Sequence, residues 1–292
     1  MTKPTLRFGI MTLQDRLWSA EVERWQRIEA LGFDSIWLAD HFYPPWLEAW
    51  TLLAALATTT TRVRMGTLVT AIAFRHPAML AKQIVTVDHI SNGRLEIGIG
   101  AGAPGARDTS YGMLGLADWP PSERVARFRE VVEILDLLLR GETTTYPGKY
   151  YPLNEAKLQP HPVQKPRPPI VVAALGAKML EIAARYADVW NSYGGRNMPD
   201  EEMMASLRRQ NEQLDAYCAK IGRDPQTLRR SALIYGQAGR QVFQSVDIFE
   251  EIIGRYREVG FTEFVCYYPF TETELPVFER VAAEVIPRLR QE

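Results

Sequence analysis

Short apolar segments alternate with longer segments of helical periodicity along almost the whole chain. The apolar segments are rich in Ile, Val, Leu and aromatic residues, as strands buried on both faces are, and each is followed by helical sequence. We expect eight strands, at 6–13, 35–40, 64–70, 94–100, 168–175, 187–194, 228–236 and 261–269. Eight such units in 292 residues predict one (β/α)8 barrel domain over residues 1–292. The alternative is an open, doubly wound sheet, which usually has about six strands.

Residues that start and stop helices mark several boundaries. Gly32 is expected to end the first helix and Pro77 to open the third, while Ser122 caps the fourth helix and Gly141 ends it. Residues 142–167 then form an insertion before the fifth strand, with a Pro-Gly turn, alternating aromatic residues and several prolines. This pattern predicts a hairpin and an extended strap at the bottom of the barrel, where a structural role is expected.

Composition narrows the classes of partner. The 34 basic and 35 acidic residues nearly cancel, so no charged surface for nucleic acid or a membrane is expected. Two cysteines, Cys218 and Cys266, have no metal-ligand spacing and indicate neither disulfides nor a zinc site. The sequence shows neither a secretory signal nor an apolar run of about 18 residues. We therefore expect a cytoplasmic protein.

Gly100, Gly102 and Gly105 have the spacing G-x-G-x-x-G, the fingerprint of dinucleotide binding. A true fingerprint needs a helix that begins within the glycines and an acidic residue at the end of the next strand. Here the glycines lead into a loop, and the acidic residue at the required distance, Glu123, lies at the start of a helix. The sequence therefore argues against nicotinamide binding. At the end of a barrel strand the glycines would instead let a flat ligand lie against bare backbone.

The carboxyl ends of the strands form the active face of a (β/α)8 barrel, so candidate site residues can be selected by position. The predicted mouth is rich in aromatic and small residues, including Tyr235 and Tyr267, and poor in acids and bases. The candidates at strand ends are Thr12, Asp40, His41, Val69, Thr70, Gly100, Ala101, Gly102, Leu175, Gly176, Ala177, Trp190 and Asn191.

His41 is the candidate for chemistry, because it is the only histidine placed at a strand end on this face. No pair of histidines has metal-ligand spacing, and neither H-E-x-x-H nor G-x-S-x-G is present, so a metal site or a hydrolase is not expected. Gly176 and Ala177 open the fifth helix, whose free amides could hold a phosphate; an ordinary strand-to-helix turn is the alternative.

Several motifs resemble the luciferase-like monooxygenase superfamily. They are Gly32-Phe-Asp-Ser-Ile-Trp37 with Asp40-His41, Arg64-Met-Gly-Thr-Leu-Val-Thr70, Arg75-His-Pro-Ala-Met-Leu-Ala81, Asp88-His-Ile-Ser-Asn-Gly-Arg94, Gly98-Ile-Gly-Ala-Gly102 and Ala183-Ala-Arg-Tyr-Ala-Asp188 with Trp190-Asn191. Together they span nearly the whole chain in the order of that family. The sequence Asp40-His41-Phe42 followed by Trp46 is most similar to the branch of oxidoreductases that use the deazaflavin coenzyme F420.

The resemblance implies a TIM barrel that binds F420 or a flavin, usually as a homodimer packed through the early helices. It implies that His41 faces the redox ring, with Asp40 beside it. It also implies that a backbone bulge at Leu68-Val69-Thr70, commonly with a cis peptide, supports the back of the ring. Gly176 and Ala177 would lie near the cofactor phosphate.

Three functions follow from these observations. The first is hydride transfer between F420 and a small organic substrate, with His41 moving the accompanying proton. The second is a monooxygenase that uses reduced FMN, because relatives with that cofactor share most of the motifs. The third is a flavin-binding protein without turnover, in which His41 only packs. Sugar phosphate is not expected as substrate, because Ala103-Pro104 replaces a glutamate that the deazaflavin sugar-phosphate dehydrogenases carry.

Overall fold

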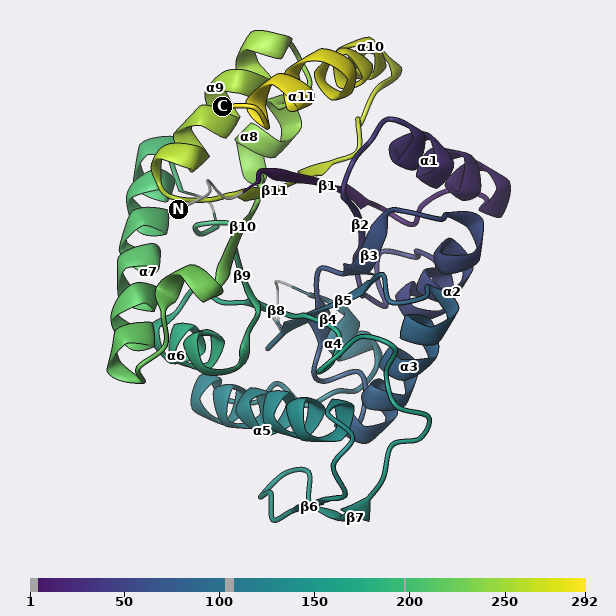
Figure 1. Cartoon of the computed structure of the whole chain (residues 1–292), viewed down its shortest axis with the longest axis vertical. Helices are drawn as coiled ribbons and strands as arrows, with labels where there is room; N and C mark the ends of the chain where they lie inside the picture. The colour runs from purple at the N-terminus through teal and green to yellow at the C-terminus, as the bar shows by residue number, and fades with distance from the viewer. Residues whose placement is uncertain (1–4, 103–107, 197) are drawn as a thin grey trace.

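Eight parallel strands close into a barrel surrounded by helices in the computed structural model, which describes residues 5–102, 108–196 and 198–292 (Figure 1). The barrel strands are β1 (Arg7–Thr12), β2 (Ser35–Leu38), β3 (Arg64–Thr67) with its continuation β4 (Thr70–Ala71), β5 (Leu95–Gly100), β8 (Ile170–Ala173), β9 (Val189–Ser192), β10 (Arg229–Leu233) and β11 (Glu263–Tyr267). They pair in the order β3-β2-β1-β11-β10-β9-β8-β5, and β3 pairs with β5 to close the ring. The predicted barrel is therefore confirmed.

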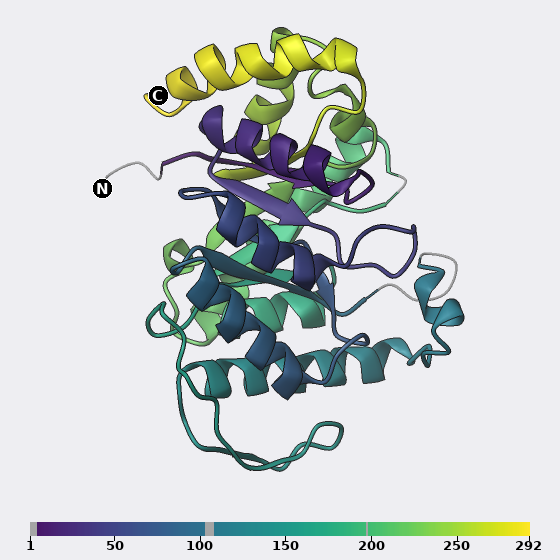
Figure 2. The ribbon, with the colours of Figure 1, turned by 90° about the vertical axis from the view of Figure 1, so that its right-hand side faces the viewer.

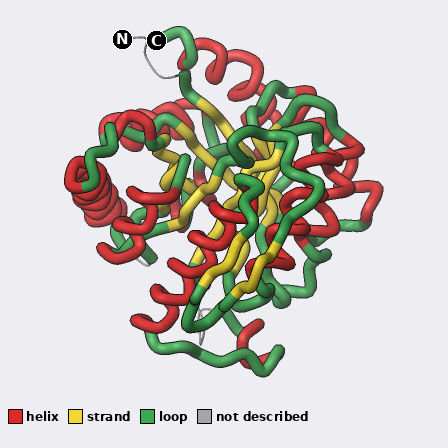
Figure 3. The backbone as a smooth tube through the Cα atoms, turned by 60° about the horizontal axis from the view of Figure 1, so that its bottom comes forward, coloured by secondary structure: helices red, strands yellow, loops and turns green. Residues whose placement is uncertain are grey.

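Helices pack around the outside of the strands, as the red coils around the yellow strands show in Figure 3. They are α1 (Trp18–Ala30), α2 (Ala49–Thr59), α3 (Pro77–Ile90), α4 (Ser110–Met113), α5 (Pro121–Leu139), α6 (Ala177–Tyr186), α7 (Asp200–Lys220), α8 (Gly236–Gln241), α9 (Val246–Glu258), α10 (Leu275–Arg280) and α11 (Ile286–Leu289). Gly32 and Gly141 end their helices with positive φ, and Pro77 opens α3, as predicted. Ser122 is not the cap of its helix: α5 begins at Pro121, whose fixed φ already suits the first turn.

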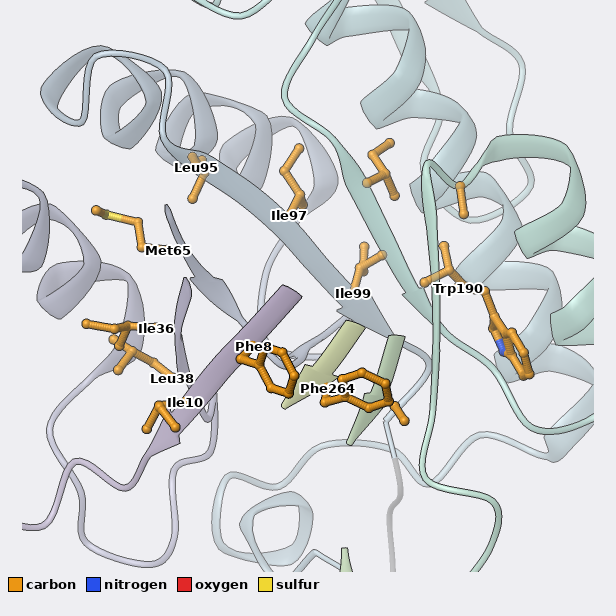
Figure 4. Close-up of a cluster of buried hydrophobic side chains, with 14 of the residues drawn as sticks. Phe8, Ile10, Ile36, Leu38, Met65, Leu95, Ile97, Ile99, Trp190 and Phe264 are labelled. Atoms are coloured by element: carbon orange, nitrogen blue, oxygen red, sulfur yellow. The ribbon is translucent and has the colours of Figure 1, made fainter. Parts of the chain in front are cut away.

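The strands present two different faces. On the outer face apolar side chains such as Phe8, Ile10 and Ile97 are buried against the helices (Figure 4). On the inner face, Met11, Trp37 and Val265 belong to a smaller apolar cluster inside the barrel. Side chains of a strand alternate between faces, so the position of each residue determines whether it reaches the interior.

A charged layer lies below the inner apolar cluster, at the amino ends of the strands. Glu96 accepts from Arg7 at 3.1 Å and from Arg64 at 2.5 Å, while Arg229 donates to Glu263 at 2.8 Å. Burial and the neighbouring Glu96 carboxylate raise the pKa of Glu263 to about 8, against the attraction of Arg7. These mutual ion pairs make the bottom of the barrel charged, whereas the interior above it is lined by the apolar cluster.

The insertion between α5 and β8 contains the predicted hairpin, formed by β6 (Thr144–Tyr146) and β7 (Leu153–Ala156). The backbone N–H groups of Tyr150 and Tyr151 donate to Glu130 on α5, and the Tyr151 ring lies 5.7 Å from that of His76. The hairpin thus lies outside α5, and its turn reaches the start of α3 after β4, so it extends toward the carboxyl ends of the strands and is not at the bottom of the barrel as predicted (Figure 2). Its contacts are with helices, which agrees with a structural role.

Candidate active site

His41 follows β2 and is paired with a carboxylate from another loop. Its Nδ1 lies 2.9 Å from Oδ2 of Asp108, and its ring packs edge-on against Trp46 at 6.3 Å between centroids. Although burial by itself would raise the pKa of Asp108, hydrogen bonds from Ser110 and His41 lower it. An ionised carboxylate can only accept, so Nδ1 carries the proton and Nε2 is the nitrogen left to exchange one.

Asp40 lies in different surroundings from His41. Its carboxylate pairs with both terminal nitrogens of Arg75, at 2.5 and 3.1 Å, and Arg75 also reaches Glu48 at 2.6 Å. Burial raises the pKa of Asp40, against the attraction of Arg75. The Asp40 carboxylate is thus engaged by Arg75 and joins the loop after β2 to the segment before α3, and its catalytic role stays a prediction.

The predicted bulge separates β3 from β4 and contains a cis peptide between Leu68 and Val69. Two glycines of β5, Gly98 and Gly100, leave the space that the bulge occupies. A β-carbon on Gly98 would overlap the Thr67 carbonyl oxygen, and one on Gly100 would lie 2.5 Å from a methyl carbon of Val69. We expected Gly100 to offer bare backbone to a flat ligand, but the bulge covers it, so this expectation is wrong for Gly100. Leu68 and Val69 pack with the inner cluster, so they form this wall of the mouth.

Three other candidates face away from the mouth. Thr12 is completely buried and follows Phe8 and Ile10 on the outer face of β1. Thr70 accepts from the Trp50 indole of α2 at 2.9 Å, and Ala101 packs against the outer core. These corrections share one reason: a strand end brings residues to both faces, and only one face is the interior. Gly102, beyond the end of β5, lies against Tyr111 of α4, whose hydroxyl a β-carbon there would overlap.

Trp190 and Asn191 illustrate the same alternation. The Trp190 indole is fully buried, donates to the Ala174 carbonyl at 2.9 Å and packs against Phe261. Its predicted contact with a cofactor is corrected, since the ring belongs to the layer between strand and helices. Asn191 lies on the other face and donates to Ser231 at 2.9 Å inside the barrel.

Three tyrosines cover the inner cluster at the carboxyl ends of the last strands: Tyr193, Tyr235 and Tyr267. Tyr235 and Tyr267 were expected at the mouth, whereas Tyr193 was not among the candidates. Burial raises the pKa of Tyr267 to about 12, so it stays protonated at neutral pH. The mouth therefore has an aromatic lining on one side and the Leu68-Val69 bulge on the other.

The amino end of α6 is free of side-chain caps. Gly176 is its N-cap, with no side-chain hydrogen bond there and open space around its Cα, and Leu175 before it is half-buried. Ala177 opens the helix, and its amide is among the first-turn donors that have no partner within the helix. The described residues around Gly176 leave this helix end open, and the binding of a phosphate there stays a prediction.

Asp108 is the functional residue that the sequence analysis missed. It lies 67 residues after its partner and in a loop, so neither periodicity nor spacing indicates it. Ala103-Pro104, which replaces the glutamate of the sugar-phosphate dehydrogenases, and Gly105 lie outside the described residues. Within residues 5–102, 108–196 and 198–292 there is no group of His, Cys, Asp and Glu that could hold a metal ion. No described helix is long and apolar enough to cross a bilayer.

Comparisons with known proteins agree with this geometry. The chain is 34% identical over 187 residues to an F420-dependent glucose-6-phosphate dehydrogenase of Amycolatopsis mediterranei, covering 61% of this chain and 54% of that one. A dehydrogenase of the same name from Beutenbergia cavernae is 29% identical over 90% of each chain. The chain thus spans little more than half of the first relative.

The fold also matches a solved structure, the F420-dependent tetrahydromethanopterin reductase of Methanopyrus kandleri, with a TM-score of 0.80 and 20% identity over 98% of this chain and 99% of that one. The model of the luciferase-like monooxygenase family matches residues 6–254, which include β1 to α9, the bulge and His41. The chain therefore belongs to the luciferase-like monooxygenase family.

Proposed function

We propose that the protein is an F420-dependent oxidoreductase that transfers a hydride between the deazaflavin and a small organic substrate. The observation that carries this proposal is the His41–Asp108 pair at the mouth of a barrel whose lining is otherwise aromatic and apolar. An apolar lining suits a flat ring, while a single oriented imidazole can move one proton. The F420-dependent dehydrogenases among the relatives support the same cofactor.

The described residues fit such a cofactor at three points. The Leu68-Val69 bulge offers an apolar surface for the back of a ring, His41 lies at the mouth, and the open Gly176 end of α6 suits a phosphate. When bound, F420 would supply the carbon that accepts or gives up the hydride. The aromatic lining would exclude water from that carbon.

His41 would act through Nε2, since Asp108 holds Nδ1. In alcohol oxidation it would take the hydroxyl proton as the hydride leaves the adjacent carbon, and in the reverse direction it would return that proton. Asp108 would be a positioning residue that fixes the tautomer of the ring.

Cofactor titration followed by single-turnover kinetics tests the proposal. We expect the purified protein to bind F420 more tightly than FMN, as measured by fluorescence. We also expect His41→Ala to slow hydride transfer at saturating F420 by at least about 10²-fold while its F420 affinity stays within several-fold. His89→Ala is the matched control, because His89 is exposed near the end of α3 and hydrogen-bonds the His161 carbonyl of the insertion, away from the mouth.

Two outcomes would contradict the proposal. If the protein binds FMN and does not bind F420, FMN is its cofactor and oxygenation becomes the favoured reaction. A His41→Ala variant whose only defect is weak cofactor binding would show that His41 holds the cofactor ring but transfers no proton.

A further inference from the structure

Large apolar side chains are exposed mainly at one end of the barrel. Nine of the thirteen that are exposed among the described residues follow the carboxyl end of a strand, including Leu17 after β1, Phe42 and Leu47 after β2, Leu114 after β5 and Phe270 after β11. Soluble proteins rarely gather such side chains on one surface without a ligand or partner to cover them. We call this set of loop residues the apolar rim.

The loops of the rim contact one another around His41. The Leu47 amide donates to the Gln14 carbonyl at 3.1 Å, which joins the loops after β1 and β2. The Tyr43 amide donates to Ser110 at 3.0 Å, which joins the loop after β2 to α4. Figure 2 shows the loop of residues 40–48 and α4 at the same end of the molecule. The rim is therefore continuous with the site of the proposed chemistry.

Two arginines beside the rim, Arg24 on α1 and Arg75 before α3, are already paired. Arg24 donates to the Leu13 carbonyl at 2.8 Å and pairs with Asp15, while Arg75 pairs with Asp40 and Glu48. Such pairing leaves neither guanidinium available as the bidentate clamp that a phosphorylated substrate would need. The described loops after β1 and β2 thus offer a substrate apolar surface beside two engaged guanidiniums, and the exposed Arg16 is the cation of the loop after β1 itself.

We propose that the substrate is an alcohol, or the corresponding carbonyl compound, carrying a hydrocarbon group that lies along the apolar rim while its reacting carbon lies beside His41. This inference rests on the proposed function. In the oxidation, the C–H bond of the carbinol breaks with its electron pair passing to F420, the O–H proton passes to His41, and a carbonyl forms. In the reverse direction the hydride would return from reduced F420 to the carbonyl carbon, and His41 would return the proton to the oxygen.

A homologous series of 2-alkanols from three to ten carbons tests the proposal, with F420 reduction as one readout and calorimetric binding of the matching 2-ketones as the other. We expect kcat/KM and ketone affinity to rise about three- to fourfold per methylene until the rim is filled. Phe42→Ser and Leu114→Ser should flatten both slopes. Ile221→Ser is the matched control, since Ile221 is an exposed apolar residue after α7, away from the rim.

Each contrary result has a distinct meaning. If F420 binds and glucose 6-phosphate is oxidised faster than any long-chain alcohol, the inference is overturned and the proposed function stands. The inference is also overturned if kcat/KM and ketone affinity of the wild type do not rise with chain length. It is overturned too if Phe42→Ser turns a dimer into a monomer but leaves the dependence on chain length unchanged. Failure to bind F420 overturns the proposed function, while ketone binding still reports on the rim.

Discussion

The imidazole of His41 has one fixed orientation because the Asp108 carboxylate holds its Nδ1 at 2.9 Å. Asp108 is itself held by the Ser110 amide, which donates to its other oxygen at 2.9 Å. Such a chain of hydrogen bonds selects a tautomer without taking part in proton transfer. At the scale of single residues, the orientation of one ring determines whether a proton can be moved.

Replacing Asp108 tests this arrangement. We expect Asp108→Asn to slow hydride transfer about 10- to 100-fold and to alter its pH profile, because an amide can donate to Nδ1 and favour the wrong tautomer. F420 affinity should stay within several-fold, and Asp108→Glu should restore part of the rate. Asp118→Asn is the control, since Asp118 is more exposed and lies 3.6 Å from Arg124. An unchanged pH profile in Asp108→Asn would contradict a positioning role.

Glu29 shows how a single carboxylate joins two elements. It accepts from the backbone N–H groups of Thr61, Arg62 and Val63, at 3.0, 2.6 and 2.8 Å, and so attaches the chain after α2 to α1. Burial by itself would raise the pKa of Glu29, but these hydrogen bonds outweigh it and lower the pKa. A lowered pKa means that the carboxylate stabilises the fold above about 4.5, its ordinary value.

We expect Glu29→Gln to lower the free energy of unfolding at pH 7 by about 1–3 kcal/mol. The difference from the wild type should shrink as the pH falls below about 4.5, because the wild-type carboxylate then becomes neutral too. Urea unfolding at a series of pH values measures both effects. Glu23→Gln, at an exposed position of the same helix, should change little at any pH. A difference that stays constant down to pH 3 would refute the linkage.

At the scale of elements, the bulge and β5 depend on each other. Gly98 and Gly100 lie where the bulge crosses the strand, and a side chain at Gly98 would overlap backbone atoms that cannot rotate away. Gly98 and Gly100 therefore serve the packing of β5 against the bulge, and of these two only Gly100 belongs to the G-x-G-x-x-G spacing.

Gly98→Ala should lower the free energy of unfolding by about 1–3 kcal/mol and also weaken cofactor binding, because the strands must separate and displace the backbone of Thr67 and Leu68 in the bulge. Gly254→Ala is the matched control. Gly254 lies within α9 with open space around it, so the same substitution should stabilise the protein by about 0.5–1 kcal/mol. Chemical unfolding and F420 titration of both variants provide the measurement; equal stability of Gly98→Ala and the wild type would show that the bulge is adaptable.

The amino end of α6 permits a test in which stability and affinity change in opposite directions. Gly176→Asp should cap the helix and raise the free energy of unfolding by a few tenths of a kcal/mol, while its charge lowers F420 affinity at least about tenfold. Gly176→Ser is the control, since serine can cap without a charge. If both variants bind F420 as the wild type does, the cofactor phosphate lies elsewhere.

At the scale of the whole molecule, the order and number of strands could be predicted because buried parallel strands leave a clear apolar pattern. The lining of the site was predicted less well. Thr12 and Trp190 were chosen because they end strands, yet both face the helices. Applying the alternation of side chains from Phe8 and Ile10 onward would have excluded Thr12. Asp108 could not have been found this way, since its contact with His41 depends on how two loops fold.

The expected homodimer requires an apolar surface on the early helices. Leu52, Leu53, Leu56 and Leu80, from which we argued it, are buried within the protomer, and Met79 and Ile90 are the exposed apolar residues of α3. We still propose a two-fold dimer, with Met79→Ser and Ile90→Ser together shifting it toward monomer. Light scattering at micromolar concentration measures this, and a wild type that is monomeric there would end the proposal.

Both cysteines of the chain are shielded from solvent. Cys218 and Cys266 are buried, and burial raises the pKa of both thiols, that of Cys266 to about 12. Thiol reagents attack the thiolate, so both should react very slowly in the folded protein. A cysteine introduced at an exposed loop position can therefore be coupled to a dye or spin label without first removing the native ones, and a pair of labels on the loops after β2 and β5 would report the distance between them as substrate binds.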